Sequence, residues 1–194
     1  MHQGQNEESL WQKLRKGEKT ALKQIYLSES TYLYNYGRKI FRDTVLVEDT
    51  IQDLFIEIWQ KHKSLGPTDS IRRYLAASLR RKIVAKLKKE SKTESVDSFD
   101  QISFNPELAI ESLIINQEMS EERAASLKKA FESLSDRQRE ILYLKFYQGL
   151  DYDQISQVLD IQYQSLRNMV SRGIKKLRAE MLIWIILLII IYSS

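Results

Sequence analysis

The chain has 194 residues, of which 43% are hydrophobic and only two are proline, so it can bury one core of fair size or two small ones. Because it has no cysteine, a disulfide framework, a thiolate nucleophile and a Cys-ligated zinc are all excluded. The formal net charge of +4 is unevenly spread, with +7 over residues 1–90, −7 over 91–122 and +4 over 123–194. Two basic modules therefore flank an acidic segment.

The first module is expected to be helical, as is the whole chain, because glycines are few and apolar residues recur at helical spacing. Apolar residues from Leu10 to Tyr26 predict one amphipathic helix or a pair interrupted near Gly17, and Tyr32 to Phe41 predicts another. The polar start, MHQGQNEES, lacks the basic and apolar regions of a secretory signal. The chain suits a reducing cytoplasm.

Residues 47–59 predict a helix with two different faces. One face is apolar and belongs to a core, and the other presents Asp49, Gln52 and Asp53. Carboxylates at this spacing could hold a metal, but the two histidines lie elsewhere, so a protein-binding or plain solvated face is favoured. The apolar stripe consists of Val47, Ile51, Leu54, Phe55 and Ile58.

After a loop at 62–70 that contains Gly66-Pro67, residues 71–89 carry eight basic side chains and no acidic one. Apolar residues at every fourth position predict a helix with one buried edge and a broad cationic surface. Such a surface neutralises phosphates and gives salt-sensitive affinity for nucleic acid. The apolar edge consists of Ile71, Leu75, Leu79, Ile83 and Leu87.

The acidic segment begins with a polar stretch, 91–105, that is typical of a linker. From Pro106 onward helical periodicity returns through Leu108, Leu113 and Ile114. The linker could repel DNA, mimic it inside a basic channel or keep the modules soluble, and the last is the default interpretation.

Residues 135–178 predict a helix followed by a helix-turn-helix. Ser135 with Gln138, and Asp151 with Gln154, match the capping box, in which the first side chain caps the helix and the second reaches back. The apolar pattern changes phase at Asp160, which indicates a turn. The second helix of the hairpin offers a mixture suited to base edges and phosphates, in contrast to a plain solvated face. Its polar residues are Gln164, Ser165, Arg167, Asn168, Ser171, Arg172 and Lys175.

The last stretch, MLIWIILLIIIYSS, has twelve consecutive apolar residues from Met181 to Tyr192. A membrane-spanning helix needs about 20, so the stretch is short for a span. Three interpretations stay open: an interfacial anchor, a strip that packs on the first module or on an inhibitor, and a self-association segment. Membrane or partner contact is slightly favoured, because such a patch alone invites aggregation.

From Leu10 to Leu177 the chain resembles the two-domain sigma factors of bacterial RNA polymerase, of the extracytoplasmic-function (ECF) type. The resemblance rests on VEDTIQDLFIEIW at 47–59, YLAASLRRKIVAKLKK at 74–89, LSDRQREILYLKFYQGLDYDQISQVLD at 134–160 and YQSLRNMVSRGIKKLR at 163–178. It implies an all-α fold with two small helical domains joined by an acidic linker, the second a helix-turn-helix. The expected segments are 8–90, the linker 91–105, 106–180 and the tail 181–194.

The resemblance also implies roles for the faces described above. Asp49, Gln52 and Asp53 would dock on the clamp helices of core RNA polymerase. The loop 62–70 would discriminate the minus-ten element of promoter DNA, where a base is extruded into a pocket. The linker would run through polymerase channels that otherwise receive RNA. The expected minus-ten contacts are Arg72, Arg73, Arg80, Arg81 and Lys82, and the expected minus-thirty-five contacts are Gln164, Ser165, Arg167, Asn168, Arg172 and Lys175.

An anti-sigma factor is an expected partner, the expected location is the cytoplasm, and an interfacial tail would add a contact with the inner face of the membrane. No catalytic residue, metal or cofactor is expected, because the chain has no Gly-rich phosphate loop and only two isolated histidines. The alternatives are a stand-alone helix-turn-helix regulator and a tail-anchored adaptor whose basic surfaces meet anionic lipid.

Three positions depart from the family pattern. Where many members have an Asn and an Asp in the basic helix, this chain has Arg81 and Ala85. At the hairpin turn, where Gly is usual, it has Asp160, which adopts a left-handed conformation more readily than most residues. We therefore expect the turn to be kept.

Overall fold

The computed structural model describes residues 2–91, 104–105 and 121–192. Within these residues the chain is helical and contains no strand, which confirms the predicted all-α class. The chain divides into two compact units, Met1–Gln101 and Ile102–Ser194, and each is described by itself. Most of the expected linker, 91–105, and the periodicity expected from Pro106 to Ile114 lie outside the described residues.

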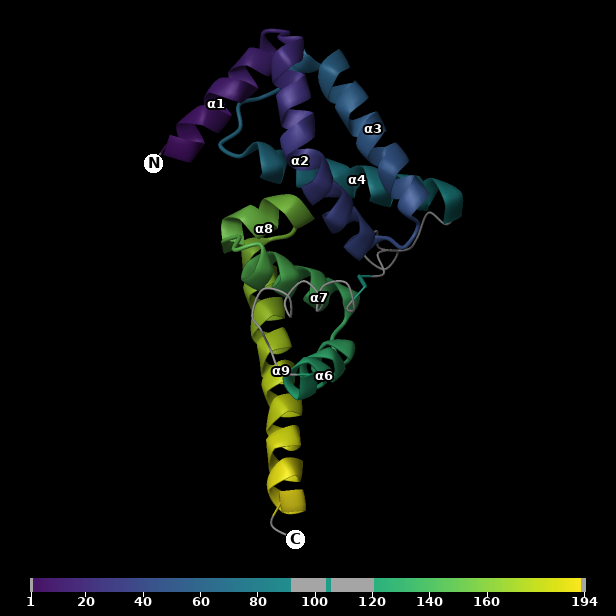
Figure 1. Cartoon of the computed structure of the whole chain (residues 1–194), viewed down its shortest axis with the longest axis vertical. Helices are drawn as coiled ribbons and strands as arrows, with labels where there is room; N and C mark the ends of the chain where they lie inside the picture. Colours follow the sequence, from purple (N-terminus) through teal and green to yellow (C-terminus); the bar gives the residue numbers. More distant parts are fainter. Residues whose placement is uncertain (1, 92–103, 106–120, 193–194) are drawn as a thin grey trace. The chain divides into compact units, whose positions relative to one another are not determined.

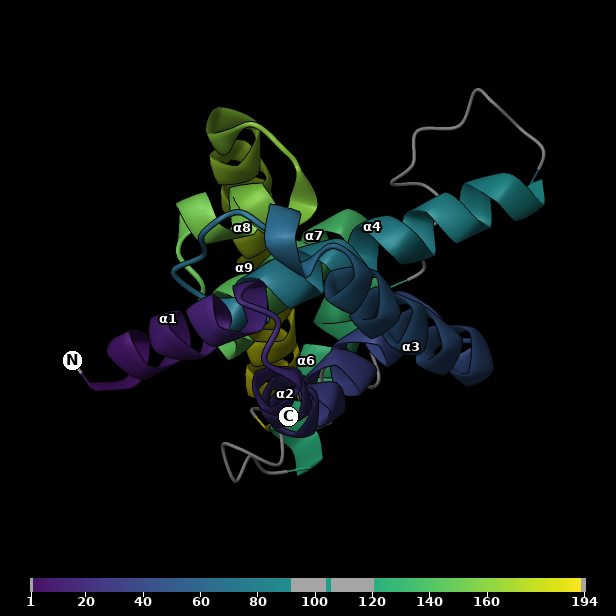
Figure 2. The same ribbon diagram turned by 90° about the horizontal axis from the view of Figure 1, so that it is seen from above.

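The first unit contains α1 (His2–Arg15), α2 (Lys19–Ile40), α3 (Thr44–Gln60), the short 3-10 turn η1 (His62–Ser64) and α4 (Ile71–Ser91). Helices α2 and α3 pack side by side, and α4 packs against both (Figures 1 and 2). The predicted apolar stripe of α3 is buried, as are the first four apolar positions of α4. The core of this unit therefore lies where these three helices meet.

Helix α2 is one continuous helix, whereas the sequence predicted separate helices ending near Tyr26 and starting at Tyr32. The polar run between them interrupts the amphipathic pattern but contains no glycine or proline to break a helix. Glu29 in this run is buried because it accepts two hydrogen bonds from Arg72 of α4. An ion pair with a distant helix thus takes the place of an apolar contact.

Gly37 of α2 lies where α2 and α3 approach closely. A Cβ atom at this position would stand 2.5 Å from Cγ1 of Val47, a side chain that is itself fully buried. We expect Gly37→Ala to lower the free energy of unfolding by about 1–3 kcal/mol through overpacking, although alanine favours a helix by about 1 kcal/mol. Urea unfolding measures the change. Gly66→Ala is the control, because no atom lies within 4 Å of its Cβ position, and a Gly37→Ala protein as stable as the wild type would contradict the close approach.

The second unit contains α6 (Glu121–Glu132), α7 (Asp136–Leu142), the π-helical turn η2 (Tyr143–Tyr147), α8 (Tyr152–Leu159) and α9 (Tyr163–Tyr192). Helices α6, α7 and α8 all pack against the long α9 (Figure 1). Phe104, which the sequence assigned to the linker, is buried and lies against the ring of Tyr143, with centroids 5.6 Å apart. This unit therefore begins before Pro106.

Helix α9 continues as one helix into the apolar tail and ends at Tyr192. The predicted recognition helix and the tail are thus one element. Within the described part of the chain, no helix is long and apolar enough to cross a membrane.

Candidate nucleic-acid interface

The polar face of α3 is exposed as predicted. Asp43 caps the helix, because its carboxylate accepts hydrogen bonds from the amides of Val45 and Leu46 at 3.0 and 3.1 Å. Further along the helix, Asp49, Gln52 and Asp53 all lie exposed, with Gln52 and Asp53 about one helical turn after Asp49. Since the opposite face is buried, this polar face is available to a partner.

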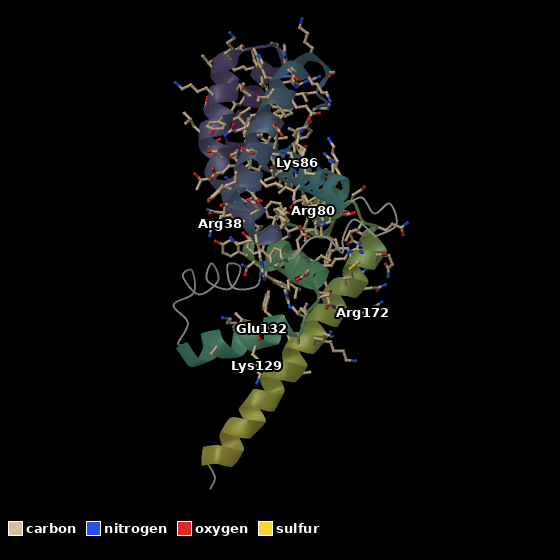
Figure 3. The ribbon with its side chains drawn as sticks, turned by 90° about the vertical axis from the view of Figure 1, so that its right-hand side faces the viewer. Arg38, Arg80, Lys86, Lys129, Glu132 and Arg172 are labelled. Carbon is tan, nitrogen blue, oxygen red and sulfur yellow. The ribbon has the colours of Figure 1, made fainter. Side chains whose placement is uncertain are left out.

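Part of the broad cationic surface that the sequence predicted for α4 is an ion-paired seam with α3. Lys86 contacts Asp53 at 2.7 Å, and Lys82 pairs with Glu57, so two lysines of α4 meet the carboxylates of α3. Figure 3 labels Lys86 and Arg80 on α4. Pairing reduces the charge that this helix can offer to phosphates.

The five predicted minus-ten cations differ in exposure. Arg80 is only 5% exposed, so its side chain lies inside the unit and the prediction that it faces DNA does not fit this structure. Arg73 contacts Asp69 at 2.6 Å, while Arg81 is exposed and donates a hydrogen bond to Ser78. The sequence pattern missed the seam because its acidic partners belong to other elements.

Arg72 ties α4 to α2. Its Nε atom lies 2.7 Å from the Glu29 carboxylate, and its guanidinium lies 4.7 Å from the centroid of the Tyr32 ring. The hydrogen bond to Glu29 raises the pKa of Arg72. Burial raises the pKa of Tyr32 to about 12, although the Arg72 charge opposes that shift. Arg72 therefore contributes to the packing of α4 on α2 at least as much as to the surface charge of the unit.

A cavity of about 350 Å³ lies between α3, α4 and the two residues that flank η1, Lys61 and Leu65. Leu54, Ile58 and Leu65 provide apolar walls, and the Tyr74 ring provides an aromatic one. Such an aromatic wall can stack against a planar group, while charged and hydroxyl side chains can bind its polar edge. The polar lining residues are Glu57, Lys61, Ser78, Arg81 and Lys82, and Ala85 completes the lining. The two departures in the basic helix, Arg81 and Ala85, thus line this cavity.

The Glu57 carboxylate forms ion pairs with two lysines, Lys61 and Lys82. Its hydrogen bonds with Lys61 and Lys82 lower the pKa of Glu57 from 4.5 to about 2. A carboxylate with a lowered pKa stabilises the fold above its unfolded-state pKa, and this contribution is lost as the pH falls from 4.5 through 2. Because the side chain is 38% exposed, solvent screening limits the contribution to less than about 1 kcal/mol.

We therefore expect Glu57→Gln to destabilise the protein slightly near neutral pH and to have a much smaller effect near pH 2. Urea unfolding of both proteins as a function of pH measures this convergence. A gap between the two proteins that stays constant over the whole range would show that Glu57 is not ion-paired in solution.

The helix-turn-helix in the second unit is built as the sequence predicted. Both capping boxes are present, with Ser135 and Gln138 at the start of α7 and Asp151 and Gln154 at the start of α8. Asp160 ends α8 with a left-handed backbone, φ 52° and ψ 52°, as expected for the turn. The Ser156 hydroxyl donates to the carbonyl of Ile161 across this turn. The turn thus sets the direction in which α9 leaves.

Helix α9 buries one side and exposes the predicted polar side. Leu166 and Val170 are buried, and Gly173 lies so close to α7 that an added Cβ would stand 3.2 Å from Leu142. Five of the predicted contact residues fall within about 100 degrees of one another on the helix, and Arg167 flanks them. Figure 3 labels Arg172 on this helix. All six predicted residues are exposed: Gln164, Ser165, Arg167, Asn168, Arg172 and Lys175.

Two family models match the chain in the order that the resemblance implied. The model of Sigma-70 region 2 matches residues 25–93, and the model of Sigma-70, region 4 matches residues 124–177. The first match contains α3, the cavity and α4, and the second contains the helix-turn-helix. Each matched segment lies entirely within one compact unit.

Curated relatives extend the likeness over most of the chain. The ECF RNA polymerase sigma factor SigK of Mycobacterium ulcerans is 23% identical over 174 residues, which cover 88% of this chain and 90% of the relative. The SigK protein of Mycobacterium sp. strain KMS is 26% identical over 158 residues, which cover 79% of each chain.

Two solved structures share the fold. CnrH, in complex with the cytosolic domain of CnrY, aligns with a TM-score of 0.56 at 19% identity over 89% of this chain and 95% of its own. The sigma factor RpoE of Bartonella quintana, in complex with the anti-sigma factor NepR, aligns with a TM-score of 0.54 at 21% identity over 82% of this chain and 95% of its own. The region 2 and region 4 models both match this chain, in that order, and the relatives named above are ECF sigma factors. The protein therefore belongs to the ECF-type sigma factors of RNA polymerase.

Proposed function

We propose that this sigma factor directs core RNA polymerase to its promoters through three surfaces, each assigned to named residues. The observation that carries the proposal is the combination of an exposed polar face and a lined cavity on α3 with a helix-turn-helix in the second unit. A stand-alone regulator would need neither the polar face nor the cavity. The protein acts where polymerase and DNA are, in the cytoplasm, and has no catalytic role of its own.

The first surface is the polar face of α3. Asp49, Gln52 and Asp53 dock on core polymerase, since their carboxylates and amide are exposed on a helix whose other side is anchored in the core. When Asp53 engages polymerase, its ion pair with Lys86 is exchanged for a contact with the partner. Lys86 is then available to DNA, which links polymerase binding to promoter binding.

The second surface is the cavity and the loop 62–70 beside it. An extruded base of the minus-ten element enters the cavity, where Tyr74 stacks on it and Ser78 and Arg81 bind its edge. Unstacking a base costs a few kcal/mol, which these contacts offset. Arg81 and Lys82 guide the strand, and Arg72 and Arg73 brace the start of α4 through their ion pairs.

The third surface is the exposed side of α9. Its polar residues enter the major groove of the minus-thirty-five element, with arginines suited to guanine edges or phosphates and amides suited to adenine. The residues assigned to this role are Gln164, Ser165, Arg167, Asn168, Arg172 and Lys175.

An anti-sigma protein holds this factor inactive until a signal releases it. The proposal is supported by CnrH and RpoE, since both are described in complexes, one with the cytosolic domain of CnrY and one with the anti-sigma factor NepR. A separate proposal concerns the tail: its twelve apolar residues follow Lys175, Lys176 and Arg178 along the chain, an order suited to contact with the anionic inner face of a membrane.

Transcription on fragmented genomic DNA tests the function directly. Purified core polymerase from the source organism is used with and without the chain lacking Met181 to Ser194. Defined new starts support the proposal, and they should not require the tail. If no new start appears while the chain alone binds duplex DNA with sequence preference, the protein is a stand-alone regulator. If no new start appears, and the full-length chain but not the shortened chain binds anionic vesicles, the adaptor interpretation replaces the proposed function.

A further inference from the structure

The loop 62–70, which includes η1 and leads into α4, is held by α1, an element distant in sequence. Trp11 of α1 is 1% exposed, and its indole N–H donates a hydrogen bond of 2.9 Å to the carbonyl oxygen of Gly66. Its ring also packs against Tyr74, with centroids 4.9 Å apart. One side chain therefore contacts both the loop and the first turn of α4.

Glu7, one helical turn before Trp11, reaches the end of the same loop. Its carboxylate accepts a hydrogen bond of 3.3 Å from the amide of Ile71, the first residue of α4. The free amides at a helix start carry partial positive charge, so a carboxylate is favourable there. Glu7 thus connects α1 to the first residue of α4.

The start of the loop also abuts the end of α1. His62 stacks on Trp59, with centroids 5.1 Å apart, and shares a hydrogen bond of 2.7 Å with its carbonyl. A Cβ at Gly17, whose φ of +86° suits glycine, would lie 3.1 Å from Nε2 of His62. The loop is therefore contacted at its start, middle and end by residues 7–17.

These contacts bear on the cavity because their targets line it or adjoin its lining. Leu65, which precedes Gly66, is 8% exposed and forms part of the cavity wall. Tyr74 packs on Trp11 and also lines the cavity. A shift of the Gly66 carbonyl or of the Trp11 ring would thus displace Leu65 or Tyr74, which are two of the cavity walls.

We propose that Trp11 is a positioning residue for minus-ten recognition, which holds the loop and the Tyr74 ring in the geometry that selects the extruded base. The inference rests on the proposed role of the cavity. Nothing in the region 2 match points to it, since that match begins at residue 25 and α1 lies before it. A purely apolar core role would need the ring of Trp11 but not its N–H group.

The variant Trp11→Phe separates these two roles. It keeps an aromatic ring against Tyr74 and removes the donor to Gly66. Because Gly66 is exposed, water can replace the lost hydrogen bond, so the variant should fold. Tyr34→Phe is the matched control, since it removes one polar atom from a half-buried ring of α2 that does not line the cavity.

The measured quantity is the ratio of initiation rates on a natural promoter and on templates with single changes in the minus-ten element. A ratio from one preparation does not depend on the folded fraction, so mere loss of stability leaves it unchanged. We expect Trp11→Phe to lower this ratio by about threefold to tenfold, the range implied by one net hydrogen bond, and Tyr34→Phe to leave it unchanged.

A third variant distinguishes a failure of the Trp11 proposal from a failure of the cavity proposal. Ala85→Leu fills the cavity from its exposed rim and should also change the ratio if the cavity selects a base. If Ala85→Leu changes the ratio and Trp11→Phe does not, the positioning role of Trp11 is wrong and the cavity proposal stands. If neither variant changes it, both proposals are wrong.

Discussion

Changing Asp49, Gln52 and Asp53 together to alanine is expected to abolish promoter initiation without unfolding the protein. All three side chains are exposed on α3, so their loss leaves the buried face of the helix intact. If each polar contact with polymerase contributes about 1 kcal/mol, the triple variant should bind core about 100-fold more weakly. Fluorescence anisotropy of the labelled factor with increasing core polymerase measures the affinity.

A charge-matched variant controls for the loss of two carboxylates and one amide. Glu8, Gln24 and Glu18 are exposed on α1, on α2 and at the residue before α2, so Glu8→Ala, Glu18→Ala and Gln24→Ala remove the same groups elsewhere. This variant should bind core like the wild type. Equal weakening in both triple variants would mean that overall charge, and not the α3 face, governs the affinity.

Replacing Arg167 and Arg172 with alanine should remove most of the selectivity for the minus-thirty-five element. Both guanidinium groups are exposed on α9, and neither belongs to the side that buries Leu166 and Val170. An arginine that contacts a base contributes about 1–3 kcal/mol, so the double variant should lose about 30-fold or more in affinity. Holoenzyme binding to promoter fragments with intact or scrambled minus-thirty-five elements measures the loss.

The salt dependence of the same binding distinguishes base contacts from phosphate contacts. If both arginines contact phosphates, the slope of log affinity against log salt falls by about two, and intact and scrambled fragments are weakened alike. Lys19→Ala with Lys23→Ala is the control, because both lysines are exposed on α2 of the first unit. If the arginine variant behaves like this control, α9 does not read the promoter.

Local chemistry explains which features could be predicted from the sequence. The capping boxes at Ser135 and Asp151 depend on residues three positions apart, and the left-handed turn at Asp160 depends on one residue. Both features could therefore be predicted from the local sequence, without knowledge of the tertiary structure. The two faces of α3 follow from helical periodicity alone. For the same reason, the exposure of the six predicted contact residues on α9 was predicted correctly.

The all-α class, the helix-turn-helix and the two faces of α3 could therefore be read from the amino-acid sequence, because they follow from neighbours within a few positions along the chain. The packing of the helices was needed to show that Arg80 is buried, that Glu29 pairs with Arg72 and that Lys82 and Lys86 contact the carboxylates of α3. It also brought Trp11 to Gly66, 55 residues away. Charge counts and periodicity show which residues share a helix face, but the partner of a charge depends on which helices pack together.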